Sequence, residues 1–402
     1  MVNSMEDYDV FYEMIDIQNK KCIMMFEDDE EFITNNILNS DFELIPLRLS
    51  YDLSNHSTEY IENTKELFIY YYNDKNSYKN ELLRLKKHFV HYRRYPFIVY
   101  LPNHNEDFEN LIKMFMDLNI ECVFDKEQFF KKINNDEKLI LIDSDDTLRR
   151  TDGNISERTK KVISQLKEQK CHIVLCTARP RYHALEVSQE IGVDEFLVSS
   201  NGAEIFDIKN QKILENTFIE KNDIYFLIEY AKKHHLRFIL TTDNIEYVTK
   251  DIRNSNQRII DIDNYKQQLS NINIKQCMFI DKNQSEIEKA KEYVMSFNTL
   301  NIVNEIKAED SYEEKWFSIG NQNSSKGSAL KYLADFLSIP IKNSIAIGDD
   351  RNDISMFQAS GFSVAMGNSD SKIKSLADYV TTSNNSDGVA KFLERILNNQ
   401  HK

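Results

Sequence analysis

The chain has 402 residues, 41% of them hydrophobic and 29% charged, with a formal net charge of −15. This length allows two or three domains with ordinary hydrophobic cores, and nine glycines and five prolines are too few for a fibrous or disordered chain. The negative charge argues against nucleic acid or an anionic membrane as the main partner.

The five cysteines are scattered, odd in number and without the spacing of a zinc site. They are therefore predicted to be buried thiols in a reducing compartment. The acidic start of the chain does not resemble a secretory signal, and no apolar run approaches the roughly 18 residues that span a bilayer. We expect a soluble cytoplasmic protein with no membrane segment.

Residues 1–136 are dense in tyrosine and phenylalanine and end in a strand, helix and strand pattern. Strands are predicted at 97–101 and 122–124, with a helix at 108–118 between them, so this extension is expected to be an α/β domain. Aromatic and basic residues combine at 92–95, as in some nucleic-acid sites, but the acidic charge of the chain outweighs this pattern. We predict no nucleic-acid partner and assign no function to the extension.

From residue 137 onward, short apolar runs alternate with helical periodicity. The run at 139–142 is typical of a strand buried on both faces, as in a parallel sheet. Further strands are predicted at 173–176 and 196–198, and the connecting helices at 156–169 and 181–191. This alternation is typical of a parallel sheet with right-handed crossovers.

Between residues 203 and 314 the pattern changes to a mixed α+β insert of domain size. It begins with a predicted hairpin at 204–216 and is expected to lie over the strand ends as a cap. The parallel pattern then resumes to residue 402. We therefore predict three parts: the extension at 1–136, a core at 137–202 and 315–402, and the cap at 203–314.

Chemically reactive residues stand where predicted strands end and at one helix start, which is where open parallel sheets place their sites. They form four groups: Asp143-Ser144-Asp145-Asp146-Thr147, Thr177-Ala178-Arg179, Lys326-Gly327 and Gly348-Asp349-Asp350-Arg351-Asn352-Asp353. Singly, each group has a structural explanation such as an acidic turn, a helix cap or a solvated lysine. Their joint occurrence in this order is much harder to explain in that way.

With these motifs the chain resembles the haloacid dehalogenase superfamily of phosphotransferases, specifically the Cof-type branch, subfamily IIB. The resemblance rests on the DxDxT motif that starts at Asp143, the motifs at Thr177 and Lys326, Asn201-Gly202 at the cap entrance, and the GDxxNDxxM motif at 348–356. It covers residue 137 to the end. It implies an α/β fold: a Rossmannoid parallel core with an inserted α+β cap of the C2B type.

The resemblance implies a phosphatase that hydrolyses a small phosphorylated metabolite, such as a sugar phosphate or a phosphorylated cofactor. Asp143 would attack phosphorus to form an aspartyl-phosphate, and Asp145 would act as general acid and then as general base. Thr177 and Lys326 would hold the phosphoryl oxygens. One residue departs from the pattern, because Asp146 stands where Cof-type proteins usually have glycine.

The same resemblance implies Mg²⁺ as cofactor, since hard oxygen ligands and a phosphate favour it. Its expected ligands are the Asp143 side chain, the Asp145 main-chain carbonyl and Asp349. Asp353 is either a further ligand or a support for the metal shell and Lys326. The candidates for substrate binding are Arg179, Asn201 and Asn352, the last of which could also support the metal shell.

Two other functions remain open at this stage. Related proteins with this cap include phosphomutases, so the phosphoryl group could pass to an acceptor other than water. In a regulatory protein, residues 1–136 would bind a partner. Whatever the function, the same residues could also assemble a homo-oligomer. The substrate itself has no motif in the sequence.

Overall fold

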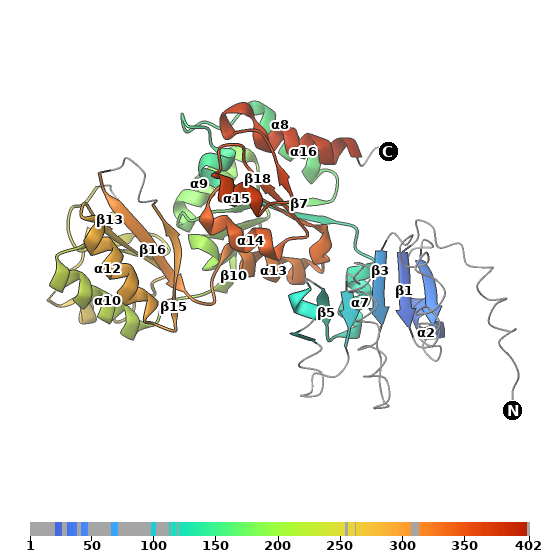
Figure 1. Ribbon diagram of the computed structural model, residues 1–402, viewed down its shortest axis with the longest axis horizontal. Coiled ribbons are helices and arrows are strands. Elements are labelled where there is room, and N and C mark those ends of the chain that lie inside the picture. The colour runs from blue at the N-terminus through green and yellow to red at the C-terminus, as the bar shows by residue number, and fades with distance from the viewer. Residues whose placement is uncertain are drawn as a thin grey trace, which may run out of the picture. The chain divides into compact units, whose positions relative to one another are not determined.

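The computed structural model describes residues 21–25, 30–37, 42–46, 66–70, 98–101, 112–113, 115–118, 120–253, 256–261, 263–306 and 313–399. The chain divides into two compact units, Met1–Asp136 and Glu137–Lys402, whose elements are labelled in Figure 1. Within the described residues, no helix combines the length and the apolar character needed to cross a bilayer. Cys122, Cys171, Cys176 and Cys277 are free thiols.

The first unit contains a five-stranded, all-parallel sheet in the order β2-β1-β3-β4-β5. Its strands are β1 (Lys21–Met25), β2 (Phe42–Pro46), β3 (Glu66–Tyr70), β4 (Ile98–Tyr100) and β5 (Glu121–Val123). Helices α2 (Glu30–Asn36) and α7 (Lys126–Ile133) contribute Ile33 and Phe129 to a buried cluster with Ile98.

The prediction of an α/β extension is therefore confirmed. Its two predicted strands correspond to β4 and β5. The predicted helix at 108–118 is described only in part, because residues 112–113 and 115–117 are helical and its beginning lies outside the described residues. The aromatic and basic segment at 92–95 also lies outside them.

The second unit is built on an eight-stranded sheet in the order β10-β9-β8-β7-β6-β17-β18-β19. Its strands are β6 (Lys138–Ile142), β7 (Cys171–Cys176), β8 (Phe196–Ser199), β9 (Glu204–Asp207), β10 (Lys212–Asn216), β17 (Ser344–Gly348), β18 (Phe362–Ala365) and β19 (Tyr379–Val380). From β8 to β19 all neighbours are parallel, while β9 and β10 add an antiparallel hairpin at one edge.

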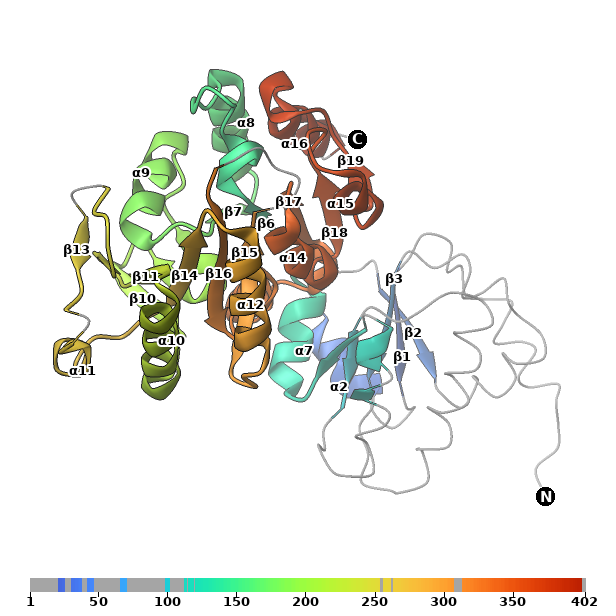
Figure 2. The ribbon, with the colours of Figure 1, turned by 60° about the vertical axis from the view of Figure 1, so that its left-hand side comes forward.

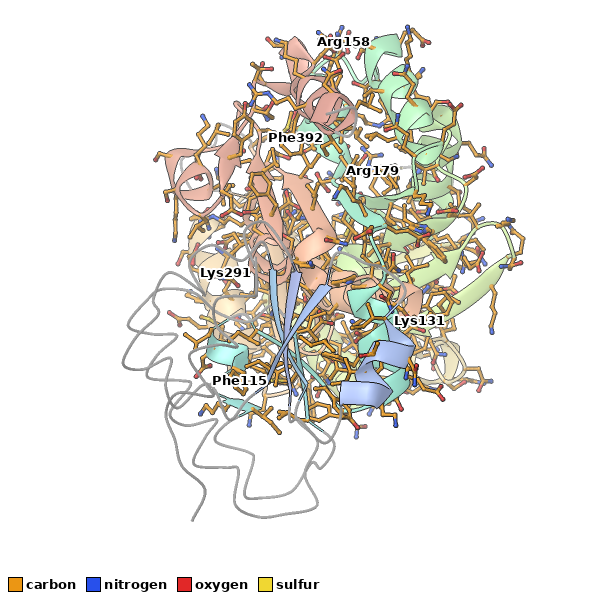
Figure 3. All side chains as sticks on the ribbon, turned by 90° about the vertical axis from the view of Figure 1, so that its right-hand side faces the viewer. Phe115, Lys131, Arg158, Arg179, Lys291 and Phe392 are labelled. Atoms are coloured by element: carbon orange, nitrogen blue, oxygen red, sulfur yellow. The ribbon has the colours of Figure 1, made fainter. Side chains whose placement is uncertain are left out.

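Helices cover both faces of this sheet, which makes three layers. One face packs against α8 (Glu157–Lys167), α9 (Arg181–Ile191) and α16 (Gly388–Asn399), and the other against α13 (Lys326–Leu337), α14 (Ile354–Ala359) and α15 (Ser371–Ser375). An ion pair between Arg158 and Glu394 joins α8 to α16, and Arg158 and Phe392 mark these two helices in Figure 3.

Strand β6 lies in the middle of the sheet and is buried on both faces, as its apolar run predicts. Ile140 and Ile142 belong to the core on one side, and Leu139 and Leu141 to the core on the other. The strand is flanked by parallel neighbours and covered on both faces, so its own side chains are shielded from solvent. Functional side chains are therefore expected just beyond its carboxyl end.

The cap contains a six-stranded sheet in the order β13-β12-β11-β14-β16-β15. Its strands are β11 (Arg237–Thr241), β12 (Glu246–Val248), β13 (Gln257–Ile259), β14 (Gln276–Asp281), β15 (Leu300–Glu305) and β16 (Lys315–Asn321). Helices α10 (Lys221–His234) and α12 (Gln284–Met295) cover one face (Figure 2), and α11 (Tyr265–Gln268) is a single short turn.

The core sheet and the cap sheet do not divide at residues 203 and 314, where the sequence predicts the limits of the insert. The hairpin β9–β10, predicted to open the insert, pairs with β8 and extends the core sheet. A two-stranded hairpin is marginal alone, and here Ile205 and Phe206 each join one of the two core clusters. Conversely, β16, whose residues fall inside the predicted second core segment at 315–402, pairs with β14 and β15 in the cap sheet.

Candidate active site

Asp143 follows directly after β6, and its side chain is buried. The chain then turns through Ser144–Leu148, where Asp146 has φ 55° and ψ 4°, in the left-handed region. This turn separates the first two acids, because Asp143 points inward while the Asp145 side chain is 48% exposed.

Lys326 is the first residue of α13, and the preceding N-cap residue Ser325 forms a capping box with Ser328. The Lys326 side chain is buried, and its Nζ lies 2.5 Å from Asp143 Oδ1 and 2.6 Å from Asp353 Oδ1. Burial alone would lower the pKa of Lys326, but the two carboxylates outweigh burial and raise this pKa above its ordinary range. The ammonium group therefore stays charged inside the site.

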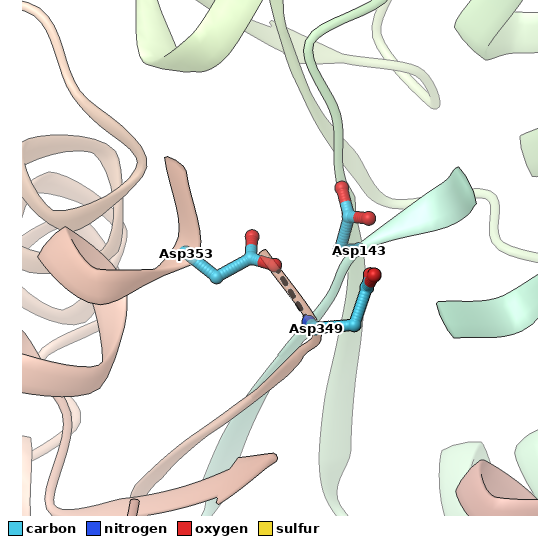
Figure 4. Close-up of side chains that lie close together, drawn as sticks. All are labelled: Asp143, Asp349 and Asp353. Atoms are coloured by element: carbon cyan, nitrogen blue, oxygen red, sulfur yellow. Dashed lines mark hydrogen bonds between the residues drawn. The ribbon is translucent and has the colours of Figure 1, made fainter. Parts of the chain in front are cut away.

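The loop after β17 folds around the carboxylate of Asp353. Asp353 Oδ2 accepts hydrogen bonds from the main-chain N–H groups of Asp349, at 2.8 Å, and Asp350, at 3.1 Å, the first of which is drawn in Figure 4. A Cβ atom at Gly348 would lie 2.3 Å from Asp353 Oδ2, so only glycine fits before this loop. Thr147 adds a hydrogen bond of 2.6 Å to Asp349 Oδ1.

Carboxylate oxygens of Asp143, Asp349 and Asp353 lie within 4.8 Å of one another, and Figure 4 shows the three side chains converging. Burial raises the pKa of Asp143 to about 7, although Lys326 opposes this shift. Burial and the carboxylates of Asp143 and Asp353 raise the pKa of Asp349 to about 9. Such crowded acids fit a divalent cation, and an all-oxygen donor set suits Mg²⁺.

The three acids are not equivalent as ligands. Both oxygens of Asp353 already accept hydrogen bonds, from Lys326 and from the main chain, which favours its predicted role as support. Asp143 and Asp349 are thus the better placed side-chain ligands, and the predicted metal role of Asp353 stays a prediction.

Arg179, labelled in Figure 3, lies between β7 and α9 and forms a bidentate ion pair with Asp145. Its Nε and Nη2 atoms lie 2.8 and 2.7 Å from the two carboxylate oxygens. Thr177 is buried at the end of β7, and its hydroxyl oxygen accepts a hydrogen bond of 3.2 Å from the N–H of Arg179. The structure thus brings the general-acid candidate and a substrate-binding candidate into contact with each other.

Asn201 and Asn352, both predicted to bind substrate, also contact each other. Asn352 Nδ2 donates to Asn201 Oδ1 at 3.1 Å, and Asn201 Nδ2 donates to Gln276 Oε1 of the cap at 3.0 Å. Asn201 is buried. Their contact with substrate stays a prediction.

A cavity of about 1190 Å³ has Asp349 of the acidic cluster and Asp146 in its wall on the core side. On the cap side its wall includes Met278, Ile280 and Trp316. No motif in the sequence indicates these cap residues. Alternation along β14 puts Met278 and Ile280 on the opposite face of the strand from Phe279. The pattern does not indicate which of these faces turns toward the core domain.

The family model of haloacid dehalogenase-like hydrolases matches residues 140–393. The chain belongs to this family. Curated members with similar sequences include the phosphatase YwpJ of Bacillus subtilis, which is 26% identical over 65% of this chain and 100% of its own length. The 5-amino-6-(5-phospho-D-ribitylamino)uracil phosphatase YcsE of Bacillus subtilis is 28% identical over 64% of this chain and 94% of its own.

Solved haloacid dehalogenase-like structures share the fold. A hydrolase of this type from B. subtilis has a TM-score of 0.57 at 25% identity and covers 64% of this chain and 99% of that one. The subclass IIB sugar phosphatase BT4131 has a TM-score of 0.55 at 19% identity, covering 64% and 98%. The predictions of the family, of its core with a cap and of a hydrolase are confirmed, and the relatives' names agree with phosphoric monoester hydrolysis.

Proposed function

We propose that this haloacid dehalogenase-like hydrolase is a Mg²⁺-dependent phosphatase that cleaves a small phosphorylated metabolite through an aspartyl-phosphate intermediate. The observation that carries the proposal is the buried contact of Lys326 with Asp143, 2.5 Å long, beside Asp349. A phosphate ester repels anionic nucleophiles, so a catalyst must place positive charge next to the attacking carboxylate. The names of the similar proteins support the same reaction class.

In the proposed mechanism, an oxygen of Asp143 forms a bond to phosphorus as the bond from phosphorus to the leaving oxygen breaks. Asp145 protonates that oxygen and later takes a proton from the water that hydrolyses the acyl phosphate. Lys326 and Thr177 contact the transferred phosphoryl oxygens. Because Arg179 holds Asp145 in this structure, a bound substrate would exchange this ion pair for its own contacts.

Asp143, Asp349 and the Asp145 carbonyl would hold Mg²⁺, which when bound neutralises and orients the phosphate. Asp353 would act through Lys326 and through the main-chain N–H groups that it binds. This division of roles assigns the metal to the two side chains with raised pKa values.

The assignment is tested by Asp143→Asn, which keeps the shape of the side chain and removes its charge. Turnover of an aryl phosphate should fall at least about 10³-fold, while circular dichroism and the melting temperature show an intact fold. Asp152→Asn, in an exposed turn, is the matched control and should keep full activity. Undiminished turnover in Asp143→Asn would contradict the role of Asp143 as nucleophile. Turnover that survives chelation of divalent cations would contradict the dependence on Mg²⁺.

The substrate is best sought among phosphorylated sugars and sugar alcohols, because one relative is named for a phosphoribityl compound and another as a sugar phosphatase. A panel of such esters, assayed with and without Mg²⁺, should identify a preferred leaving group. Measuring free against transferred phosphate in the same assays separates hydrolysis from the phosphomutase or phosphotransferase alternative.

A further inference from the structure

Two neighbouring residues of the cap, Lys275 and Gln276, place polar side chains against buried groups of the core. Lys275 Nζ contacts the carboxylate of Glu204 in the core strand β9, and both side chains are almost fully buried. Gln276 Oε1 accepts a hydrogen bond of 3.0 Å from Asn201 Nδ2, also in a buried setting. The beginning of β14 is thus fixed to the core by two buried contacts.

From Asn201 the hydrogen bonds continue into the acidic loop. Asn201 Oδ1 accepts from Asn352 Nδ2 at 3.1 Å. The next residue is Asp353, whose carboxylate binds Lys326 and the main-chain N–H groups of Asp349 and Asp350. Three side-chain amides therefore connect the cap sheet with the loop that carries the acidic cluster.

The backbone at Asn201 explains why this residue can reach all of these groups. Its φ of 55° and ψ of 35° lie in the left-handed region, where asparagine is among the better tolerated residues. Its N–H donates to Thr177 O at 3.0 Å. A Cβ at the following Gly202 would lie 2.1 Å from Ser325 O, so the turn packs directly on the start of α13.

The cap end of the connection has its own consequence for the cavity. Side chains two apart on a strand share a face, so Gln276, Met278 and Ile280 lie on one face of β14. The latter two line the cavity that Asp349 also lines. Gln276, which fixes β14 to the core, thus lies on the same face of the strand as Met278 and Ile280, the two residues that would contact a leaving group.

We propose that Gln276 and Asn201 are positioning residues that couple the seating of the cap to the geometry of the loop Asp349–Asp353. Removing the amide contact should loosen that loop as well as the cap. The catalytic consequence rests on the proposed phosphatase function, but the coupling itself does not. It is a different role from the substrate contact that the family resemblance implies for Asn201.

The coupling is tested by hydrogen exchange in the full chain, without substrate or metal. In Gln276→Ala, the amides of Asp349 and Asp350 should exchange about fivefold faster, as expected for the loss of one net hydrogen bond. Gln276→Glu keeps an acceptor for Asn201 and should restore slow exchange, whereas the exposed cap variant Gln267→Ala should match the wild type. Unchanged exchange at residues 349 and 350 in Gln276→Ala, with faster exchange only in β14, would overturn the proposal.

A second arm removes the other partner and measures Mg²⁺ binding by calorimetry. Asn201→Gly deletes the side chain but suits the left-handed backbone, so the fold should be kept. Each single variant should weaken Mg²⁺ binding by about tenfold, as for other outer-sphere changes, and the double variant should be no weaker than the worse single. Additive losses, or unchanged Mg²⁺ affinity, would overturn the coupling. Wild-type protein that binds Mg²⁺ without hydrolysing phosphate esters would contradict the proposed function instead.

Discussion

The turn after β6 explains why Asp146 stands at a position where glycine is usual. Its φ of 55° lies in a region that glycine enters without strain, which accounts for the glycine usual at this place in Cof-type proteins. Its carbonyl oxygen accepts a hydrogen bond of 2.8 Å from Asn368, and its exposed side chain lines the cavity. The backbone thus tolerates aspartate here, and the cavity wall gains a carboxylate.

Replacing Asp146 should therefore separate backbone strain from side-chain chemistry. Asp146→Gly relieves the left-handed conformation, whereas Asp146→Ala keeps the strain and loses the polar side chain. We expect the glycine variant to be more stable than the alanine variant by about 1 kcal/mol, measured as midpoints of thermal unfolding. Equal midpoints would show that the turn relaxes around alanine.

His172 provides a pH-dependent contribution to stability on β7. Its Nδ1 lies 2.8 Å from Glu195 and its Nε2 3.4 Å from Glu137. The hydrogen bond with Glu195 is the largest cause that raises the pKa of His172, while partial burial opposes it. Because the folded pKa is raised, the stabilisation is complete below the unfolded pKa of about 6.5 and is lost as the pH rises through the folded pKa.

We therefore expect wild type to exceed His172→Gln in stability by about 1 kcal/mol at pH 5.5, and by much less at pH 8.5. Thermal unfolding of both proteins across this range measures the difference. A difference that stays constant with pH would mean that the imidazole contributes by packing alone.

At the scale of elements, the buried ion cluster between β9 and the cap tests how the cap is held. Lys275 contacts Glu204 and Asp243, and Arg181 lies 3.2 Å from Glu204. Lys275→Met would leave buried carboxylate without its main partner, at a cost of about 3 kcal/mol in unfolding free energy. The double variant Lys275→Met/Glu204→Gln should recover most of this loss, and failure to recover would show that Lys275 stabilises the cap by other contacts.

Periodicity predicts the elements of the core because each pattern is local. The apolar run of β6 requires burial on both faces, and the acids after it must then stand at a strand end. Sheet membership is not local, however, since hydrophobic alternation in β9 or β16 is the same whichever sheet it joins. For that reason the predicted limits of the insert differ from the pairing observed.

In the candidate site, too, some residues can be predicted from local sequence and others cannot. Asp143, Lys326, Asp349 and Asp353 belong to motifs, so the sequence indicates them, and the structure brings them together. Gln276 belongs to no motif, and no motif indicates that Arg179 and Asp145 form an ion pair. They depend on contacts across 75 and 34 residues of chain, which only the folded backbone defines.

At the scale of the whole molecule, the family match begins at residue 140 and leaves the first unit unassigned. That unit has its own sheet and its own buried cluster around Ile33, Ile98 and Phe129. Its predicted roles in homo-oligomer formation or partner binding stay predictions, as does the cytoplasmic location of the protein.

A chain that begins at Asn135 should therefore fold and keep the turnover of the full protein within about twofold, because the site residues all lie beyond it and separate domains fold as units. Light scattering on both chains gives the oligomeric state. A smaller assembly in the truncated chain would assign oligomer formation to the first unit. An insoluble product would contradict the independence of the second unit.

The long separation between partners in the site has a consequence for biosynthesis. Thr147 and Asp349 are 202 residues apart, and Asp143 and Lys326 are 183 apart. At a translation rate of about 5–20 residues per second, the strand that precedes the proposed nucleophile Asp143 waits on the order of 10–40 s for these partners. A nascent chain thus carries Asp143 without the lysine or the acidic loop, and the contacts of the site form only after Lys326 and residues 349–353 have emerged from the ribosome.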